Sequence, residues 1–234
     1  MRELKEGEGG KIREMKRSRE IEKSSEINSA IEELSMLVVV KPGANNEIAH
    51  IPTKPFLSLC YLVLQVLDKI GPTMAVLRQD IHQNIKRLEV MHELNPSVNS
   101  NLVEILKSEA SKGIAKKRFS CSKAFAWLTR SLDFSTALLE SLAKDPKKNM
   151  EQIVQESYAA TLSPWHGWIA SAAFRVAIKL VPDSKTFMDL LKEKDENCDT
   201  QKEKMQILVS LLVPFLEDIH RIIKLYNLDR LKST

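Results

Sequence analysis

Residues that cross-link a chain or interrupt its regular structure are scarce in this sequence of 234 residues. The cysteines number only three, form no CxxC pair and have no histidine close by in the sequence; they are Cys60, Cys121 and Cys198. An odd number of widely separated cysteines argues against a disulfide framework and against a zinc site. We therefore expect a protein of a reducing cytoplasm that holds no metal and needs no cofactor.

Strong charge of one sign and long apolar runs are missing as well. The 35 Lys and Arg residues exceed the 31 Asp and Glu residues by only four, and the basic residues are dispersed along the chain. Nucleic-acid binding is not indicated, because it typically shows a basic stripe with interleaved aromatic residues. No run reaches the length of about 18 apolar residues expected of a membrane-spanning helix, so we expect a soluble protein.

The beginning of the chain differs in composition from the rest. Its first residues mix charges of both signs with glycine and contain no apolar segment, which fits neither a secretory signal nor a Met-Gly lipidation site. We expect 1–25 to be a flexible charged tail. The remaining 26–230 is long enough to form one domain with a substantial core.

Apolar residues recur at i, i+3 and i+4 through long segments, which predicts an all-α domain. The predicted helices are 26–37, 54–69, 73–92, 97–113, 119–143, 149–180, 184–193 and 201–226. Pro164 lies inside the sixth of these and indicates a helix start or a kink, with Ser163 able to act as a cap. The valine-rich run from Met36 to Val40 resembles a strand but is too isolated to build a sheet.

Polar residues interrupt the apolar faces at three places, and the first is "RQDIHQNIKRL". Asp80, Asn84 and Arg87 follow one another at i, i+4 and i+7, so they form a polar column that spans roughly 60° of the helix surface. The apolar stripe of the same helix is centred about 90° away, which puts the column at the border of the buried face. The border suits the mouth of a pocket, although a solvated face with an Asp–Arg pair has the same spacing.

The second interruption is "CSKAFAWLTRSLDF", in which Lys123, Trp127 and Arg130 share one helix face. Two interpretations fit this arrangement. Trp127 packs in the core while both cations extend outward along their methylene stems, or Trp127 is an aromatic plate for a sugar ring or a cation.

The third interruption is "SPWHGWIAS", in which Trp165 and Trp168 enclose His166 and Gly167. The segment fits a core wedge, a catalytic histidine in an aromatic box, or a binding surface for an apolar ligand with a polar end. An enzyme is the least favoured of these, because no nucleophile stands beside His166 in the sequence.

Together the three stretches resemble the glycolipid transfer protein family. The shared motifs are Asp-x3-Asn-x2-Lys/Arg in "DIHQNIKRL", Trp-Leu-x-Arg in "AWLTRSLDF" and His-Gly-Trp in "WHGWIASAAF", in the family's order and spacing. The resemblance extends from about residue 27 to 226, and it is strongest to plant members. It implies a two-layer all-α fold that encloses a hydrophobic lipid pocket, with no chemical reaction and no catalytic residue.

The resemblance also implies a headgroup site. Asp80, Asn84 and Arg87 would bind the sugar, Trp127 would lie beneath it, and His166 would donate to the ceramide amide. The chemistry is suitable, because a carboxylate accepts hydrogen bonds, an asparagine both donates and accepts, and a guanidinium donates from a rigid fork. An indole face can cover the C–H side of a sugar.

Further roles follow from the same resemblance. Trp168 would contact the membrane interface, where an apolar ring with a polar N–H is well placed, whereas Trp165 is expected in the core. Phe174 would line the acyl-chain pocket, with Leu211 and Phe215 as further candidates. The expected partners are a sphingolipid and, transiently, a membrane surface, and the protein would act as a monomer.

Two departures from the family pattern bear on the headgroup. Arg87 stands where the best-known glycolipid-binding members have Lys, and Lys123 stands where phosphate-selective relatives have Arg. Those relatives also have Arg at the position of Trp127 and commonly Lys at that of Asn84, so two cations that would pair with a phosphate are missing here. Lys123 and Arg130 are still candidate headgroup ligands. The sequence favours transfer of a neutral glycosylceramide; the alternatives are ceramide-1-phosphate transfer and a lipid sensor or scaffold without bulk transfer.

Overall fold

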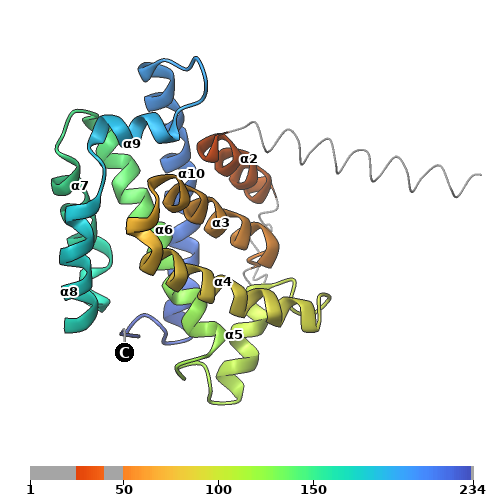
Figure 1. The fold of residues 1–234 in the computed structure, drawn as a ribbon. Helices are drawn as coiled ribbons and strands as arrows, with labels where there is room; N and C mark the ends of the chain where they lie inside the picture. Colours follow the sequence, from red (N-terminus) through yellow and green to blue (C-terminus); the bar gives the residue numbers. More distant parts are fainter. Residues whose placement is uncertain (1–24, 40–49, 233–234) are drawn as a thin grey trace, which may run out of the picture.

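The computed structural model describes residues 25–39 and 50–232, which form α-helices joined by short connections (Figure 1). The helices are α2 (Glu26–Val39), α3 (Thr53–Ile70), α4 (Ala75–Leu94), α5 (Leu102–Ser111), α6 (Cys121–Lys144), α7 (Met150–Thr161), α8 (Trp168–Ala177), α9 (Ser184–Leu191) and α10 (Cys198–Leu225). Within the described ranges, β-pairing is limited to one isolated bridge between Pro52 and Asn101. The prediction of an all-α fold is confirmed. The predicted tail lies outside the described residues, apart from Ser25.

The single helix predicted over 149–180 is wrong, because the structure has two α-helices there. α7 ends at Thr161, and α8 begins only at Trp168. A 3-10 turn, η2 (Ser163–Trp165), follows α7, and Pro164 in this turn cannot donate to a continuing helix. His166 is consequently extended (φ −79°, ψ 136°) at the junction of two helices.

Other expected boundaries also shift. α5 begins at Leu102 rather than near residue 97, because the side chain of Asn101 accepts from the backbone N–H of Val103 and caps the helix there. The valine-rich run is helical from Met36 to Val39, at the end of α2, and Val40 lies outside the described residues.

The helices pack in two layers. α2, α3 and α4 form one layer, and α6, α7 and α10 form the other, with α4 packed on α6 and α2 on α10 (Figure 1). The apolar faces meet between the layers, where the fully buried rings of Phe56 and Phe125 lie 5.0 Å apart. None of the described helices combines the length and the apolar character that crossing a bilayer requires.

A buried carboxylate fixes the beginning of α6. Glu109 of α5 is 6% exposed and accepts hydrogen bonds from the backbone N–H groups of Cys121 (2.8 Å) and Ser122 (2.7 Å) and from the Ser122 hydroxyl (2.6 Å). Ser120 caps the same helix by accepting from the N–H of Lys123 at 3.0 Å. A carboxylate at a helix N-terminus satisfies donors that have no partner within the helix. The face that carries Trp127 is therefore set by contacts at the preceding residues.

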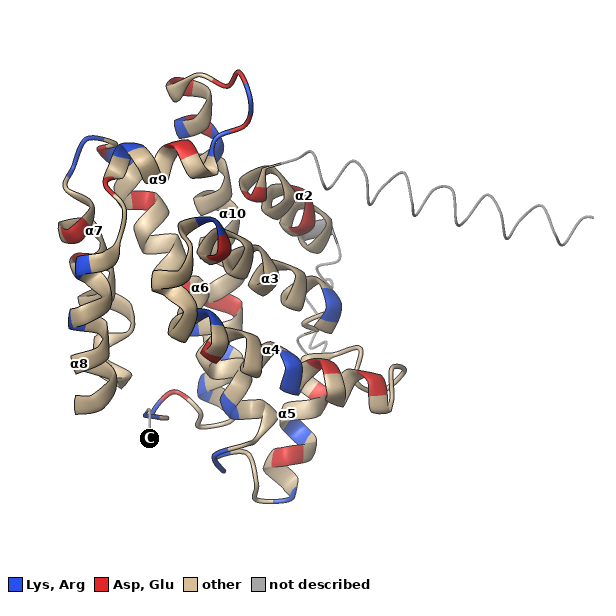
Figure 2. Ribbon diagram, viewed as in Figure 1, with Lys and Arg blue, Asp and Glu red and all other residues tan. Residues whose placement is uncertain are grey.

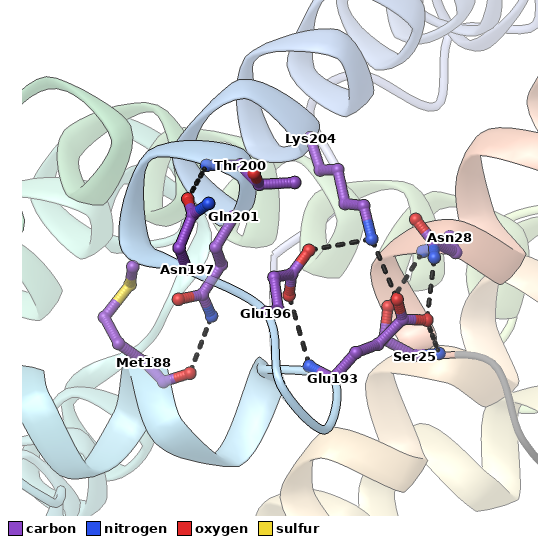
Figure 3. Close-up of polar contacts among 9 residues, drawn as sticks. All are labelled: Ser25, Asn28, Met188, Glu193, Glu196, Asn197, Thr200, Gln201 and Lys204. Atoms are coloured by element: carbon purple, nitrogen blue, oxygen red, sulfur yellow. Dashed lines mark hydrogen bonds and ion pairs between the residues drawn. The ribbon is translucent and has the colours of Figure 1, made fainter.

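A polar clamp, made by Ser25, Asn28, Glu193, Glu196 and Lys204, joins the start of α2 to the connection between α9 and α10 (Figure 3). The Glu193 carboxylate accepts from the Ser25 N–H at 2.9 Å and from the Asn28 amide at 2.7 Å. The Lys204 ammonium lies 2.8 Å from Glu193 and 2.7 Å from Glu196. Hydrogen bonds from Lys204 and from Ser25 lower the pKa of Glu193 to about 2.

Candidate functional site

An apolar cavity of about 220 Å³ lies between the two layers. Its walls include Ile27 of α2, Leu67 of α3, Leu132 of α6 and Phe174 of α8, and His166 is one of the few polar residues among them. A cavity with such walls is suited to hydrocarbon rather than to a polar ligand.

The predicted pocket residues of α10 lie beside this cavity rather than in its wall. Leu208 and Leu212 supply the α10 part of the wall. Leu211 and Phe215 are partly buried and pack against the core. The i, i+4 spacing of Leu208 and Leu212 shows which face of α10 turns toward the cavity, and the sequence alone leaves the choice of face open.

A larger groove, of about 950 Å³, lies between the α6–α7 connection and the starts of α9 and α10. Charged residues contribute much of its lining, among them Lys147, Lys148, Asp183 and Asp189. Burying hydrocarbon there would remove water from these charges at a high cost, so this groove is not suited to an acyl chain.

The polar column of α4 is held by contacts along its own helix. The Asn84 side chain is buried, donates to the Asp80 carbonyl at 3.1 Å and accepts from the Arg87 guanidinium at 3.2 Å. Burial raises the pKa of the Asp80 carboxyl, and the Arg87 guanidinium opposes this increase. The Cys121 thiol donates to the Arg87 carbonyl at 3.7 Å and so ties the column to the start of α6.

On α6, the guanidinium of Arg130 lies over two indole rings. Its guanidinium carbon is 4.7 Å from the ring centroid of Trp127 and 4.3 Å from that of Trp165. The same guanidinium donates to the backbone carbonyls of Leu231 (2.6 Å) and Asp229 (3.1 Å). Arg130 is only 4% exposed, and burial lowers its pKa to about 10.

This arrangement contradicts the interpretation in which both cations of α6 extend outward. Lys123 is 9% exposed and Arg130 is buried, whereas Trp127 between them is half-buried. Trp165, expected in the core, is also half-buried and covers Arg130. A cation between two aromatic faces is favourable because the faces carry partial negative charge.

His166 connects the aromatic rings to the cavity. Its ring centroid lies 5.5 Å from that of Trp127, and its Nδ1 lies 3.0 Å from the hydroxyl of Tyr158 on α7. Tyr158 in turn stacks on Phe174, with centroids 3.5 Å apart and an interplanar angle of 9°. Burial, and secondarily Arg130, lowers the pKa of His166. The imidazole is therefore neutral at neutral pH and can donate from one nitrogen only.

Positive charge surrounds this site. Lys and Arg residues gather around the start of α6 and the neighbouring part of α4 (Figure 2). Burial lowers the pKa of Lys123, and Arg118, Arg87 and Arg130 add to this effect. Within the described ranges, the Lys123 ammonium has no hydrogen bond and no ion pair with another side chain. The guanidinium groups of Arg87 and Arg118 lie 5.6 Å and 5.3 Å from the ring centroid of the exposed Phe119.

The structure thus brings some of the predicted residues into direct contact and others only onto facing helices. Trp127, Arg130 and His166 are neighbours, whereas the residues of the α4 column lie on a helix that packs on α6. Sequence patterns missed Tyr158 and the stacking role of Trp165. The apolar periodicity of α7 made Tyr158 look like any core residue.

The sequence matches the family model described as Glycolipid transfer protein (GLTP) over residues 51–193. It is 53% identical to Glycolipid transfer protein 2 of Arabidopsis thaliana over 222 residues, which cover 94% of this chain and 100% of that relative. Glycolipid transfer protein 3 of the same plant is 51% identical over 226 residues, which cover 94% of this chain and 97% of the relative.

Solved structures with the same fold come from studies of different lipids. The GLTP-fold of FAPP2, from a study of how FAPP2 selects simple glycosphingolipids, has a TM-score of 0.72 at 28% identity and covers 80% of this chain and 92% of its own. A mutant of Arabidopsis ACD11 complexed with ceramide-1-phosphate has a TM-score of 0.74 at 18% identity, over 88% of this chain and 97% of its own. At 18% identity this second likeness concerns the fold alone.

Proposed function

The chain belongs to the glycolipid transfer protein family, and we propose that it carries a neutral glycosylceramide between membranes without changing it chemically. The hydrocarbon chains would enter the apolar cavity, and the sugar would rest against Trp127. Burial of each methylene group contributes about 0.8 kcal/mol, so an acyl chain supplies most of the binding free energy. Because about 220 Å³ is less than the roughly 300–1,000 Å³ of ordinary ligand pockets, side chains must move as the lipid enters.

The environment of Arg130 is the observation that favours a sugar over a phosphate. Two of its N–H groups donate to backbone carbonyls, and its guanidinium carbon lies over the indole rings of both Trp127 and Trp165. A phosphate ligand needs a guanidinium fork with free donors. Arg130, one of the candidate phosphate ligands, has both of its terminal nitrogens engaged, so a phosphate that paired with these two nitrogens would compete with the backbone carbonyls.

The α4 column supplies donors and acceptors that match sugar hydroxyls. Asp80 accepts, Arg87 donates, and the Asn84 amide retains a second N–H and a second lone pair beyond its contacts within the helix. His166 would donate to the carbonyl of the ceramide amide, which would otherwise stay unpaired in an apolar cavity.

The test is a vesicle transfer assay with glucosylceramide and, separately, ceramide-1-phosphate. Asp80→Val removes an acceptor whose lipid donors then stay unpaired, at a cost of roughly 1–3 kcal/mol each, so glucosylceramide transfer should fall steeply. Asp68→Val, which removes an exposed carboxylate of α3, is the matched control and should have no effect. Trp127→Arg should shift the preference toward ceramide-1-phosphate. The proposal fails if the unchanged protein transfers ceramide-1-phosphate but no glucosylceramide.

Ceramide-1-phosphate is the second candidate, and Lys123 is the observation that favours it. Lys123 is buried, and its ammonium has no anionic partner among the residues that the structure describes, so it would gain from a phosphate. In this case Lys123→Ala should abolish transfer, and transfer should weaken strongly as salt is added. A lipid sensor or scaffold would instead bind lipid but fail to move many molecules per protein between vesicles.

Membrane contact would occur through the exposed apolar side of α8. Trp168 is 80% exposed, Ile169 60% and Val176 65%, and the cations Arg175 and Lys179 lie in the same segment. Such a surface supports weak, reversible binding to a bilayer. Trp168→Ala should reduce vesicle partitioning and slow transfer without changing the melting temperature, whereas Leu94→Ala, an equally exposed control on α4, should do neither. Unchanged partitioning in Trp168→Ala would refute this contact.

A further inference from the structure

The hydroxyl of Tyr158 links the imidazole of His166, in the connection between α7 and α8, to a side chain of α8. Tyr158 of α7 is buried, and its hydroxyl lies 3.0 Å from Nδ1 of His166 and 3.3 Å from the hydroxyl of Ser171 on α8. The stack on Phe174 holds the tyrosine ring in this position. The Nε2 atom of His166 has no hydrogen-bond partner among the described residues, and His166 belongs to the cavity wall.

The hydroxyl of Tyr158 has one proton for two neighbours. An imidazole nitrogen is a stronger base than a hydroxyl oxygen and lies closer here, so the geometry favours a hydrogen bond from the tyrosine O–H to Nδ1 of His166 over one to Ser171. The Ser171 hydroxyl can then supply its own proton to the tyrosine oxygen. With Nδ1 occupied as an acceptor, the single proton of the neutral imidazole must reside on Nε2.

We propose that Tyr158 is a positioning residue that fixes the tautomer and the ring orientation of His166, so that Nε2–H is presented to the amide carbonyl of a ceramide. The proposal rests on the lipid role given to His166 in the proposed function. It holds for either headgroup, because the ceramide amide is common to glucosylceramide and ceramide-1-phosphate. Phe174 then has two effects, because it forms part of the cavity wall and also supports the tyrosine.

The first experiment needs no lipid. Nitrogen-15 NMR of the full chain at about pH 7.5, where a histidine of lowered pKa is neutral, should show a non-protonated Nδ1 and a protonated Nε2 for His166. The signals are assigned by their loss in His166→Gln. Tyr158→Phe keeps the ring and its stack on Phe174, and it should move the Nδ1 resonance. A protonated Nδ1 in the unchanged protein, or an Nδ1 signal unaffected by Tyr158→Phe, overturns the proposal.

The second experiment measures lipid binding in a double-mutant cycle. Tyr158→Phe should weaken binding of glucosylceramide from vesicles by roughly three- to tenfold, the effect of one hydrogen bond. In the His166→Gln background, which has no tautomers, Tyr158→Phe should have no further effect. Tyr61→Phe, which loses a 2.7 Å hydrogen bond to Glu89 away from the site, is the control and should bind normally.

The outcomes separate this proposal from the proposed function. An equal loss of affinity in both backgrounds means that Tyr158 acts only by packing, which overturns the positioning role. Unchanged affinity after a clear shift of the Nδ1 resonance also overturns it. If the protein binds ceramide-1-phosphate and not glucosylceramide, the proposed headgroup is wrong, and the same cycle is measured with ceramide-1-phosphate.

Discussion

Replacing Arg130 by methionine tests whether this residue holds the site together or binds the headgroup. Methionine is unbranched, apolar and uncharged, and it ends about where the Nε atom of arginine lies, so it keeps the stem of the side chain and removes the guanidinium. It removes both hydrogen bonds to the carbonyls of Asp229 and Leu231 and both contacts with the indole faces.

The magnitude follows from these contacts. Two hydrogen bonds from a charged donor contribute roughly 3–6 kcal/mol together, and the two cation–π contacts add about 1–2 kcal/mol each. Against this, the fall of the Arg130 pKa from 12.5 to about 10 corresponds to roughly 3 kcal/mol by which its surroundings disfavour the charged form. The net loss of stability in Arg130→Met should therefore be about 2–7 kcal/mol, in the lower part of this range because such contributions are not fully additive.

Urea unfolding followed by circular dichroism measures this loss, and the vesicle assay measures its consequence. We expect glucosylceramide transfer to fall in Arg130→Met with no change in its dependence on salt, because the missing cation did not face the ligand. Arg130→Lys should give a similar loss, since an ammonium cannot bridge both carbonyls. A variant of unchanged stability that loses ceramide-1-phosphate binding in a salt-dependent manner would show that Arg130 is a headgroup ligand.

Three further predictions concern the frame around the site. Glu109→Gln should lower the free energy of unfolding by roughly 2 kcal/mol in urea titrations, because an amide cannot replace all three hydrogen bonds at the start of α6; a change below about 0.5 kcal/mol would contradict this role. The hydrogen bond to Asp133 raises the pKa of His220, so this pair stabilises the fold below about pH 6.5, and the contribution is lost as pH rises through the raised pKa. The difference in unfolding free energy between the unchanged protein and His220→Gln should therefore shrink from pH 6 to 8. The pKa of Glu193 is lowered from 4.5 to about 2, so its contribution to the stability of the fold is complete above pH 4.5 and is lost as pH falls toward 2. The melting temperature of Glu193→Gln should therefore differ from that of the unchanged protein at pH 6 and converge with it near pH 2.

Most of the helices could be predicted because their local signals agree with their tertiary environment. In α4 and α6, apolar spacing, helix-forming residues and a boundary signal all indicate the same segment, and the layers bury the apolar faces that the spacing marks. The range 149–180 was predicted as one helix, although Pro164 indicated a helix start or a kink within it, because apolar residues continue at helical intervals on both sides of Pro164. Spacing cannot show that the chain turns between two such runs.

The candidate site could be predicted in its motifs but not in its contacts. Spacing on one helix placed Asp80, Asn84 and Arg87 together, because residues three and four apart are neighbours on a helix surface. Arg130 depends on partners 35 and about 100 positions away, namely Trp165 and the carbonyls of Asp229 and Leu231. Backbone carbonyls leave no trace in the sequence, so no pattern could have indicated that this arginine is occupied.

Arg130 is held by the backbone carbonyls of Asp229 and Leu231, and this determines which changes the chain tolerates after α10. Asn227 adopts a left-handed conformation (φ 54°), which turns the chain after α10, and the fully buried Leu228 anchors it. The two carbonyls that follow are present whatever residues occupy positions 229 and 231. Single substitutions at positions 229 and 231 would therefore leave both carbonyls in place, whereas a truncation before Asp229 would remove two hydrogen-bond acceptors of Arg130 at once. The segment supports Arg130 through the position of its backbone and not through its side chains.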